Sequence, residues 1–453
     1  MTFAPDSHPE YIDDLAGFIA ASPSSYHAAA ELERRLEAGG FTRLDERDEW
    51  PGSAGSAGST VGANAAVARR HFIVRDGAVV AWVQPAGVGP VSPFRILGAH
   101  TDSPGFKLKP KPTIGNRGWL QAGVEVYGGP LLNSWLDREL ELAGRLVTRD
   151  GTEHLVRTGP FLRIPQLAIH LDRDANNGLT LDRQRHLNPV YGVGDLDAAD
   201  LLAHLAGLAG LEAADVAGYD LLTADSAAPA RFGLGNVLFA AGRLDNLSSV
   251  HAGLVALLAV TDDDTAGLDA AAGVVQSTSV LAAFDHEELG SQTRSGASGP
   301  LLDDVLTRIG AGLGASASDK LRAYAASWCL SADAGHLVHP NYPEKHDPVN
   351  LPVPGAGPLL KINATQRYAT DAAGAALWAR TCAQAGVAYQ EFVSNNTVPC
   401  GSTIGPLTAT RLGIHTVDVG IGLLSMHSAR ELCHVADPVA LSAAIGAFFA
   451  PGE

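Results

Sequence analysis

The sequence is poor in cysteine and has no long hydrophobic run. Four cysteines occur among 453 residues, and no two of them have Cys-x-x-Cys spacing, which argues against a disulfide framework and a cysteine-rich zinc site. No apolar stretch reaches the ~18 residues that a membrane-spanning helix needs. The first residues, MTFAPDSHPEYIDDL, lack the basic-then-apolar pattern of a signal peptide. We therefore expect a cytoplasmic protein with reduced thiols and no membrane association.

Basic residues are also scarce relative to acidic ones. The chain has 32 Lys and Arg against 49 Asp and Glu, which gives a formal net charge of -17 at pH 7. Such a surface repels phosphate backbones and anionic headgroups, so binding to nucleic acid or to a membrane surface is disfavoured. Apolar residues make up 46% of the chain, enough for a large core, and the length allows two or three domains.

The N-terminal quarter has helix and strand patterns. Residues 10–38 place apolar side chains at three- and four-residue intervals, which is typical of helices. Residues 71–84 have β-branched residues on both sides of Asp76-Gly77, the pattern of a hairpin. The segment FRILGAH, which ends at His100, is predicted to be a buried strand. Residues 51–66 are of low complexity and are predicted to be a loop.

After about residue 240, strand-like and helix-like segments alternate. We expect strands at STSVLAAF (277–284), YAASWCLSAD (324–333) and HTVDVGIG (415–422), with helices between them. This alternation predicts an α/β fold with a mostly parallel sheet covered by helices on both faces.

The middle of the chain differs, because short strand-like pieces alternate there with Gly, Pro and Asp turns. We therefore predict an α/β domain made of residues 1–104 and 240–453. A β-rich domain of residues 105–239 is inserted into it.

Side chains that bind metals recur after the predicted strands of the α/β domain. Sites in open α/β sheets gather beyond the carboxyl ends of the strands. The candidates at these positions are His100, Asp102, Asp245, Glu287, Glu288, Asp333 and His427. Imidazoles and carboxylates in this combination are the ligands that two zinc ions require.

A dinuclear site makes specific demands on these residues. It needs one carboxylate that bridges metals ~3.5–4 Å apart, terminal ligands on each side, and a base that is not a ligand. His100 and Asp102 are two residues apart, so on an extended chain they point to one side and Asp102 can orient the imidazole. Of the adjacent Glu287 and Glu288, one can bind metal while the other accepts a proton from the attacking water.

Each of these motifs also has an ordinary structural interpretation. A His-x-Asp loop is more often a hydrogen-bonded pair, and adjacent glutamates are usually solvated. Asp333 and Asp245 can each cap a helix, and His427 can be a core histidine. The recurrence of such residues at five successive strand ends or loops favours the metal site.

Eight stretches, spread over nearly the whole chain, carry a family resemblance. They are GAHTDSPGFKLKP (98–110), RIPQLAIHLDR (163–173), GRLDNLSS (242–249), FDHEELGSQT (284–293), SADAGHLVHPNYPEKHDP (331–348), LLKINATQRYATD (359–371), PCGSTIGP (399–406) and MHSARE (426–431). In this order they resemble the aspartyl aminopeptidase family of dinuclear zinc metallopeptidases.

The resemblance implies a metal-binding role for five residues. It assigns His100 and Asp333 to one zinc ion and Glu288 with His427 to the other. Asp245 is expected to bridge the two ions. The implied cofactor is two zinc ions per subunit, with cobalt or manganese as possible substitutes.

The resemblance also implies roles for residues that are not ligands. Glu287 is expected to be the general base and Asp102 to orient His100. His170 matches a histidine that enters the active site of a neighbouring subunit, where it contacts the substrate. Lys361 is our candidate for pairing an acidic substrate side chain, with a solvent-exposed strand lysine as the alternative.

The implied reaction is hydrolysis of the N-terminal residue of peptides, with a preference for Asp or Glu and a water activated by the two zinc ions. The implied assembly is a tetrahedral dodecamer built from dimers that the β-rich domain forms. A neutral aminopeptidase and an N-acyl amino acid deacylase remain as alternatives, because both use the same metal site. A non-catalytic assembly protein is a further alternative, but it is expected to have lost a ligand or the base, and all six are present.

Overall fold

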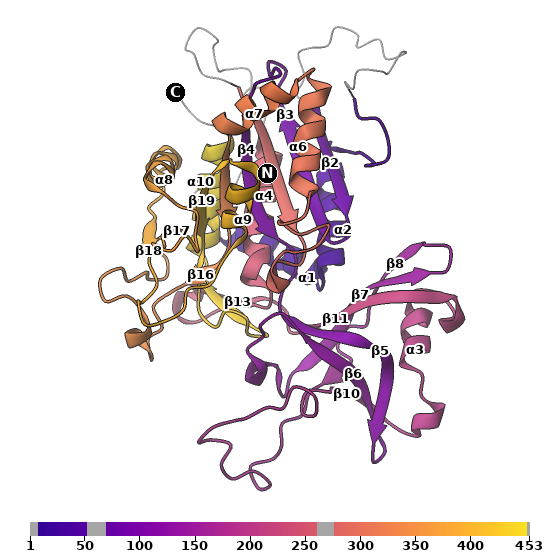
Figure 1. The fold of residues 1–453 in the computed structure, drawn as a ribbon. Helices are drawn as coiled ribbons and strands as arrows, with labels where there is room; N and C mark the ends of the chain where they lie inside the picture. Colours follow the sequence, from indigo (N-terminus) through magenta and orange to yellow (C-terminus); the bar gives the residue numbers. More distant parts are fainter. Residues whose placement is uncertain (1–7, 52–68, 261–275, 451–453) are drawn as a thin grey trace.

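A computed structural model describes residues 8–51, 69–260 and 276–450 (Figure 1). All but the first residue of the low-complexity segment 51–66 lies outside the described residues. A nine-stranded sheet forms the centre of the larger part. Its strands, in spatial order, are β1 (Thr42–Arg43), β2 (Arg69–Arg75), β3 (Ala78–Gln84), β14 (Thr278–Phe284), β4 (Phe94–His100), β15 (Trp328–Ala332), β19 (His415–Gly420), β17 (Leu359–Lys361) and β18 (Gln390–Phe392).

The four central strands of this sheet, β14, β4, β15 and β19, are all parallel to one another. Every residue of β14 is buried, as expected for a parallel strand that is covered on both faces. Successive side chains of a strand point to opposite faces. In β4, Leu97 and Ala99 accordingly belong to one hydrophobic cluster and Phe94 and Ile96 to another.

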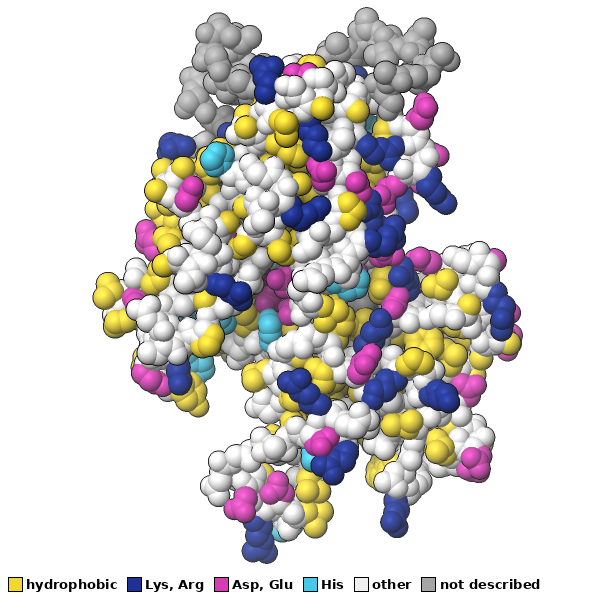
Figure 2. All heavy atoms as spheres, in the orientation of Figure 1, with side chains coloured by type: hydrophobic (Ala, Val, Ile, Leu, Met, Phe, Trp, Pro, Cys, Tyr) yellow, Lys and Arg dark blue, Asp and Glu magenta, His cyan; other side chains and the backbone are white. Residues whose placement is uncertain are grey.

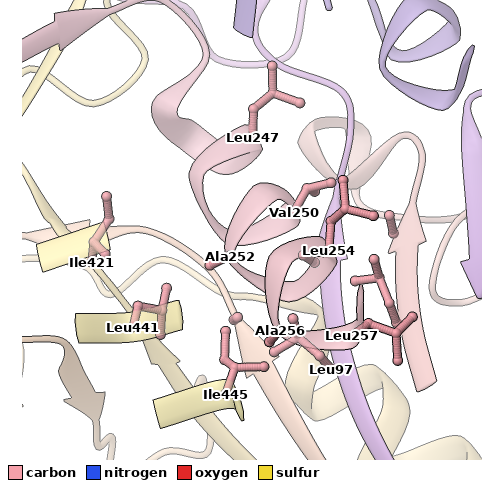
Figure 3. Packing of buried hydrophobic residues seen from close by; sticks show 14 of the residues in the cluster. Leu97, Leu247, Val250, Ala252, Leu254, Ala256, Leu257, Ile421, Leu441 and Ile445 are labelled. Atoms are coloured by element: carbon pink, nitrogen blue, oxygen red, sulfur yellow. The ribbon is translucent and has the colours of Figure 1, made fainter. Parts of the chain in front are cut away.

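Helices cover the two faces of the sheet. The first cluster includes residues of α1 (His8–Ala21), α2 (Ser25–Ala38), α4 (Leu244–Ala259), α8 (Ala372–Ala385) and α10 (Ala436–Phe449). The second includes residues of α6 (Leu301–Gly312), α7 (Ala317–Ala326) and α9 (Ile404–Leu412). Figure 3 shows α4 at the centre of the first cluster, where Leu254 and Leu257 lie near Leu97 of β4, and Leu441 and Ile445 of α10 lie on the side of Ala252 and Ala256. The predicted α/β fold with a mostly parallel sheet is therefore confirmed.

Most of the expected elements are present, but one boundary was wrong. The hairpin around Asp76-Gly77 forms as β2 and β3. The strand expected at 324–333 begins at Trp328, because Tyr324 lies in the last turn of α7. A capping box of Ser316 and Asp319 starts this helix. The Ser327 hydroxyl donates to the carbonyl of Ala323 and accepts from Phe94 N–H, and the strand follows directly.

A second sheet is built from residues between 105 and 225, and it has seven strands that pair only in antiparallel fashion. The order is β11 (Val216–Asp225), β5 (Gly105–Asn116), β6 (Trp119–Tyr127), β10 (Val190–Val193), β9 (Leu162–Arg163), β7 (Glu139–Thr148) and β8 (Glu153–Arg157). Because β11 also pairs with β7, the sheet closes on itself like a barrel. It encloses its own hydrophobic cluster, with α3 (Leu201–Leu208) packed against it.

The barrel lies below the larger part in Figure 1. A three-stranded sheet joins two strands that follow the barrel in the chain, β12 (Ala230–Phe232) and β13 (Leu238–Ala241), to β21 (Glu431–His434) from the C-terminal part. Among the described residues, no helix combines the length and the hydropathy that crossing a bilayer takes.

Candidate metal centre

The candidate ligands meet at one edge of the nine-stranded sheet. His100 is the last residue of β4, and Asp333 directly follows β15. Glu288 lies in η6 (Glu287–Leu289), which follows β14. These three strands are parallel neighbours, so their carboxyl ends share one edge. Asp245 joins them from the first turn of α4.

His427 reaches the same place from the loop between β20 (Gly422–Leu423) and β21. Figure 2 shows acidic and histidine side chains together near the middle of this face, between the larger part and the barrel.

Asp245 lies between two imidazoles. Its Oδ1 is 3.3 Å from Nε2 of His100, and its Oδ2 is 3.4 Å from Nε2 of His427. Asp333 Oδ1 lies 3.4 Å from the same His100 nitrogen, and Glu288 Oε1 lies 3.4 Å from the same His427 nitrogen. Two groups of three donors therefore share one carboxylate, which is the arrangement that a dinuclear metal centre needs.

Both imidazoles present the correct nitrogen. Nδ1 of His100 lies 3.0 Å from the carbonyl oxygen of Asp102, and Nδ1 of His427 lies 3.0 Å from that of Gly129. A carbonyl only accepts hydrogen bonds, so Nδ1 carries the proton in each case. In the neutral ring, Nε2 then offers its lone pair to a metal.

The carboxylates are buried without enough hydrogen-bond donors. His100 is 1% exposed and Asp245 4%. Within the described ranges, Oδ1 of Asp245 and Oε1 of Glu288 are buried and accept no hydrogen bond. Buried carboxylate oxygens without donors are costly unless a cation is nearby. The residues therefore fit metal ions.

The pKa values of the cluster have the same physical cause. Burial, together with the charges of Asp333 and Asp245, raises the pKa of Glu287 to about 7. Burial and Asp245 raise the pKa of Glu288 well above its usual value. Burial opposes protonation of His427, but Asp245 and Glu288 nevertheless raise its pKa to about 10. Carboxylates this close repel one another, and either protons or metal cations relieve the repulsion.

Asp102 accepts hydrogen bonds from the backbone of both adjacent glutamates. Its Oδ1 accepts the N–H of Glu287 at 2.9 Å, and its Oδ2 accepts the N–H of Glu288 at 3.2 Å. Asp102 also lies beside His100, although its carbonyl is closer to the imidazole Nδ1 than its carboxylate, whose Oδ1 is 3.5 Å away.

Two neighbouring residues were missed in the sequence. Glu431 is 2% exposed and accepts N–H groups from both Asp245, at 2.9 Å, and His427, at 2.8 Å. Burial and Asp245 raise its pKa to about 8. It lies in the MHSARE stretch, so a signal was present. Tyr127 donates its hydroxyl to Asp102 at 2.9 Å, and no local pattern marked it.

Three of the ordinary structural interpretations are wrong. Arg243, not Asp245, is the N-cap residue of α4, and Asp333 lies between β15 and β16 (Gly335–His336) rather than at a helix start. The side chains of Glu287 and Glu288 are only 18% and 5% exposed. They point to different imidazoles and are not solvated.

The two expected substrate-binding residues lie in different surroundings. Lys361 is 1% exposed, so the alternative of an exposed strand lysine is wrong. Its Nζ donates to the carbonyl of Ala334 at 2.6 Å and lies 3.7 Å from Oδ2 of Asp333. These two acceptors allow the ammonium to be buried. His170 is exposed in the long segment between β9 and β10, outside the cluster.

Comparison with known proteins is decisive for the family. The sequence model of a family described as aminopeptidase I zinc metalloprotease (M18) matches residues 18–449. The chain belongs to the M18 family. It is 52% identical over 441 residues to a probable M18 family aminopeptidase 2 of Streptomyces avermitilis, with 97% of each chain covered.

Solved structures agree with this assignment. The chain of Ape4 in its complex with Nbr1 superposes with a TM-score of 0.89 at 32% identity, covering 98% of this chain and 86% of that one. The mApe1 dodecamer of S. cerevisiae gives a TM-score of 0.78 at 28% identity, with 98% and 96% covered. This M18 protein is therefore a zinc aminopeptidase, a hydrolase of the class that the sequence predicted.

Proposed function

We propose that this M18 aminopeptidase binds two zinc ions and removes the N-terminal residue of peptides. His100 and Asp333 hold one ion, Glu288 and His427 hold the other, and Asp245 bridges them. The observation that supports this best is the position of Asp245, whose two oxygens face two different imidazoles. Zinc bound there would polarise the scissile carbonyl and lower the pKa of a water molecule towards neutrality. Cobalt and manganese are the expected substitutes.

Glu287 is the general base in this proposal, and the hydrogen bonds to Asp102 support the division of labour. Asp102 fixes the backbone N–H of both glutamates. Glu288 Oε1 then lies beside His427, whereas Glu287 Oε2 lies on the His100 side, 3.9 Å from Nε2. Glu287 accepts the proton of the attacking water and gives it to the leaving amine.

His100, Glu287 and Glu288 also form a group with donor atoms close enough to share a metal. The roles of the two glutamates therefore need a direct test, which the Discussion describes.

The preferred substrate carries an N-terminal Asp or Glu. Lys361 supports this preference, because its buried ammonium places a positive charge at the Asp333 end of the cluster, 3.7 Å from Oδ2 of Asp333. A neutral aminopeptidase and an N-acyl amino acid deacylase are the alternatives, and anilides compared with N-acetyl amino acids distinguish them.

The proposed assembly is a homo-oligomer, a tetrahedral dodecamer built from dimers. Residues 105–239 form its dimerisation domain, and residues 1–104 with 240–453 form the catalytic domain. The solved mApe1 dodecamer supports this proposal. So do the side chains around His170, because Leu167, Ile169 and Leu171 are 56%, 45% and 75% exposed. Apolar residues clustered in this way are typical of an interface, and His170 would then enter the active site of the partner subunit. The cytoplasmic location stays a prediction.

Metal analysis tests the central proposal. After reconstitution with zinc and removal of excess ion, about two ions per chain are expected, and chelation should abolish activity. Asp245→Asn should lose metal, whereas Asp303→Asn, which alters an acid of α6 that pairs with Lys320 of α7, should retain both ions. A wild-type protein that binds no ion, or an Asp245→Asn variant with full occupancy, would contradict the proposal.

A further inference from the structure

The chain leaving the barrel contacts both halves of the candidate metal centre. Tyr127 ends β6, and residues 127–131, called the 127–131 segment below, continue from it. The Tyr127 hydroxyl donates to Asp102 Oδ2 at 2.9 Å. The Gly129 carbonyl accepts from Nδ1 of His427 at 3.0 Å, and the Leu131 N–H donates to the carbonyl of His427 at 2.8 Å. One short stretch of the barrel part thus contacts residues at both ends of the ligand set.

On the His100 side, the segment acts through Asp102. This carboxylate is 3% exposed, and each of its oxygens accepts a backbone N–H of one glutamate. Among the residues that the structure describes, Tyr127, which is 7% exposed, adds the one side-chain hydroxyl donor. A buried carboxylate that loses such a donor shifts towards its remaining partners, and those partners are the backbones of Glu287 and Glu288.

On the His427 side, the segment acts directly. The Gly129 carbonyl fixes both the proton on Nδ1 and the rotation of the ring, which keeps Nε2 directed at Asp245 and Glu288. Gly128 has φ +68°, and a Cβ at this position would lie 3.1 Å from Cβ of Glu288. The absence of a side chain at Gly128 therefore lets the segment pass close to a proposed ligand.

We propose that the 127–131 segment positions Glu287 and Glu288 through Asp102 and His427 directly, with Tyr127 as the positioning residue that bonds to Asp102. The barrel part is then a support of the catalytic centre within its own subunit. This inference rests on the proposed ligand set. It assigns Tyr127 no contact with the substrate.

Tyr127→Phe tests the hydroxyl, and Tyr324→Phe is the matched control. Tyr324 is also buried and also donates to an aspartate, Asp303, at 2.8 Å, but it lies in α7 and packs against Phe94, at the start of the strand that ends at His100. Cobalt is titrated into the chelated proteins while the visible absorption bands are recorded. Partners that bond a metal ligand directly are typically worth about 10–100-fold in metal affinity, and Tyr127 acts one step further out, so a loss at the lower end of this range, about 10-fold, is expected. We expect Tyr127→Phe to bind cobalt that much more weakly and with shifted bands, and to lower kcat with KM near the wild-type value. When chelated, it should melt no lower than Tyr324→Phe, which loses an equivalent buried hydrogen bond.

Gly128→Ala tests the second contact, with Gly118→Ala as its control. Both glycines have left-handed backbone angles, but a Cβ at Gly118 would meet nothing within 4 Å. Both variants therefore place a side chain at a positive φ, and only Gly128→Ala should weaken cobalt binding.

The outcomes separate this inference from the proposal it rests on. If the wild-type protein fails to bind two cobalt ions, the ligand set itself is wrong. If the wild type binds two and Tyr127→Phe and Gly128→Ala match it in affinity and spectrum, the inference alone is overturned. Equal losses in Tyr324→Phe or Gly118→Ala would show a general effect on the fold and would also overturn it.

Discussion

Replacing Glu287 with glutamine is the sharpest test of the mechanism. The substitution keeps the size of the side chain but removes its ability to accept a proton at neutral pH. The backbone N–H of residue 287 still donates to Asp102, so the loop should keep its conformation. Loss of a general base typically costs about 10²–10⁴-fold, which corresponds to about 2.7–5.4 kcal/mol of activation free energy.

The expected result is therefore a kcat reduced by that factor, with KM and metal content near the wild-type values. The assay combines steady-state hydrolysis of an amino-acid anilide with metal analysis of the same sample. Glu288→Gln is the matched control, because Glu288 Oε1 lies 3.4 Å from His427 Nε2 and its loss should remove metal. If Glu287→Gln loses metal and Glu288→Gln retains it, the two roles have been exchanged and the reasoning from Asp102 is refuted.

Three further predictions concern stability, selectivity and assembly. Glu431, with a pKa raised to about 8, and His427, raised to about 10, both bind more protons folded than unfolded. The melting temperature of the chelated protein should therefore fall as pH rises from about 6.5 to 8.5, and added zinc should remove most of this dependence on pH. A melting temperature that stays constant or rises over this range would contradict the prediction. Lys361→Met should lower kcat/KM on every substrate, because Lys361 neighbours the proposed ligand Asp333. The loss should be about 10–100-fold larger on an Asp-anilide than on a Leu-anilide, which is the expected contribution of a Lys–carboxylate contact. Equal losses on both substrates would favour a neutral aminopeptidase. Light scattering should give about twelve chains per particle, and His170→Phe should lower activity without loss of metal, whereas a fully active monomer would refute a role for His170 in the partner subunit.

Part of the metal centre could be predicted from the sequence because it follows from strand order. His100, Glu288 and Asp333 each come just after a buried apolar segment, and the carboxyl ends of parallel strands share one edge. Asp245 and His427 are different, because they reach the site from a helix start and a loop. Their recurrence beside the other candidates predicted them as ligands, but only the family resemblance assigned one as the bridge and the other to a particular ion, since no periodicity in the sequence fixes how a helix start or a loop meets that edge.

The boundary at Tyr324 could not be read from residue preferences for a related reason. Tyr324 and Trp328 both favour strands, but Ser316 and Asp319 start a helix that continues past Tyr324. The buried position of Tyr324 against α6, fixed by its bond to Asp303, outweighs its local preference. Lys361 is a similar case, because its burial depends on the carbonyl of Ala334 and on Asp333, both distant in the sequence.

The residues that the sequence did not reveal are those that connect separate parts of the chain. Glu431 lies at the edge strand β21 and accepts from the backbones of Asp245 and His427, and Tyr127 brings the barrel to Asp102. Neither needs to bind metal, so neither carries the spacing of a ligand motif. Both nevertheless lower the freedom of groups that would bind metal, and this matters because several carboxylates are buried together and repel one another. Rigid neighbours prevent the carboxylates from moving apart to reduce their repulsion. Binding of a cation is then the more favourable way to neutralise their charge. Metal binding, the contact of Tyr127 with Asp102 and the contacts of Glu431 with Asp245 and His427 should accordingly stabilise one another.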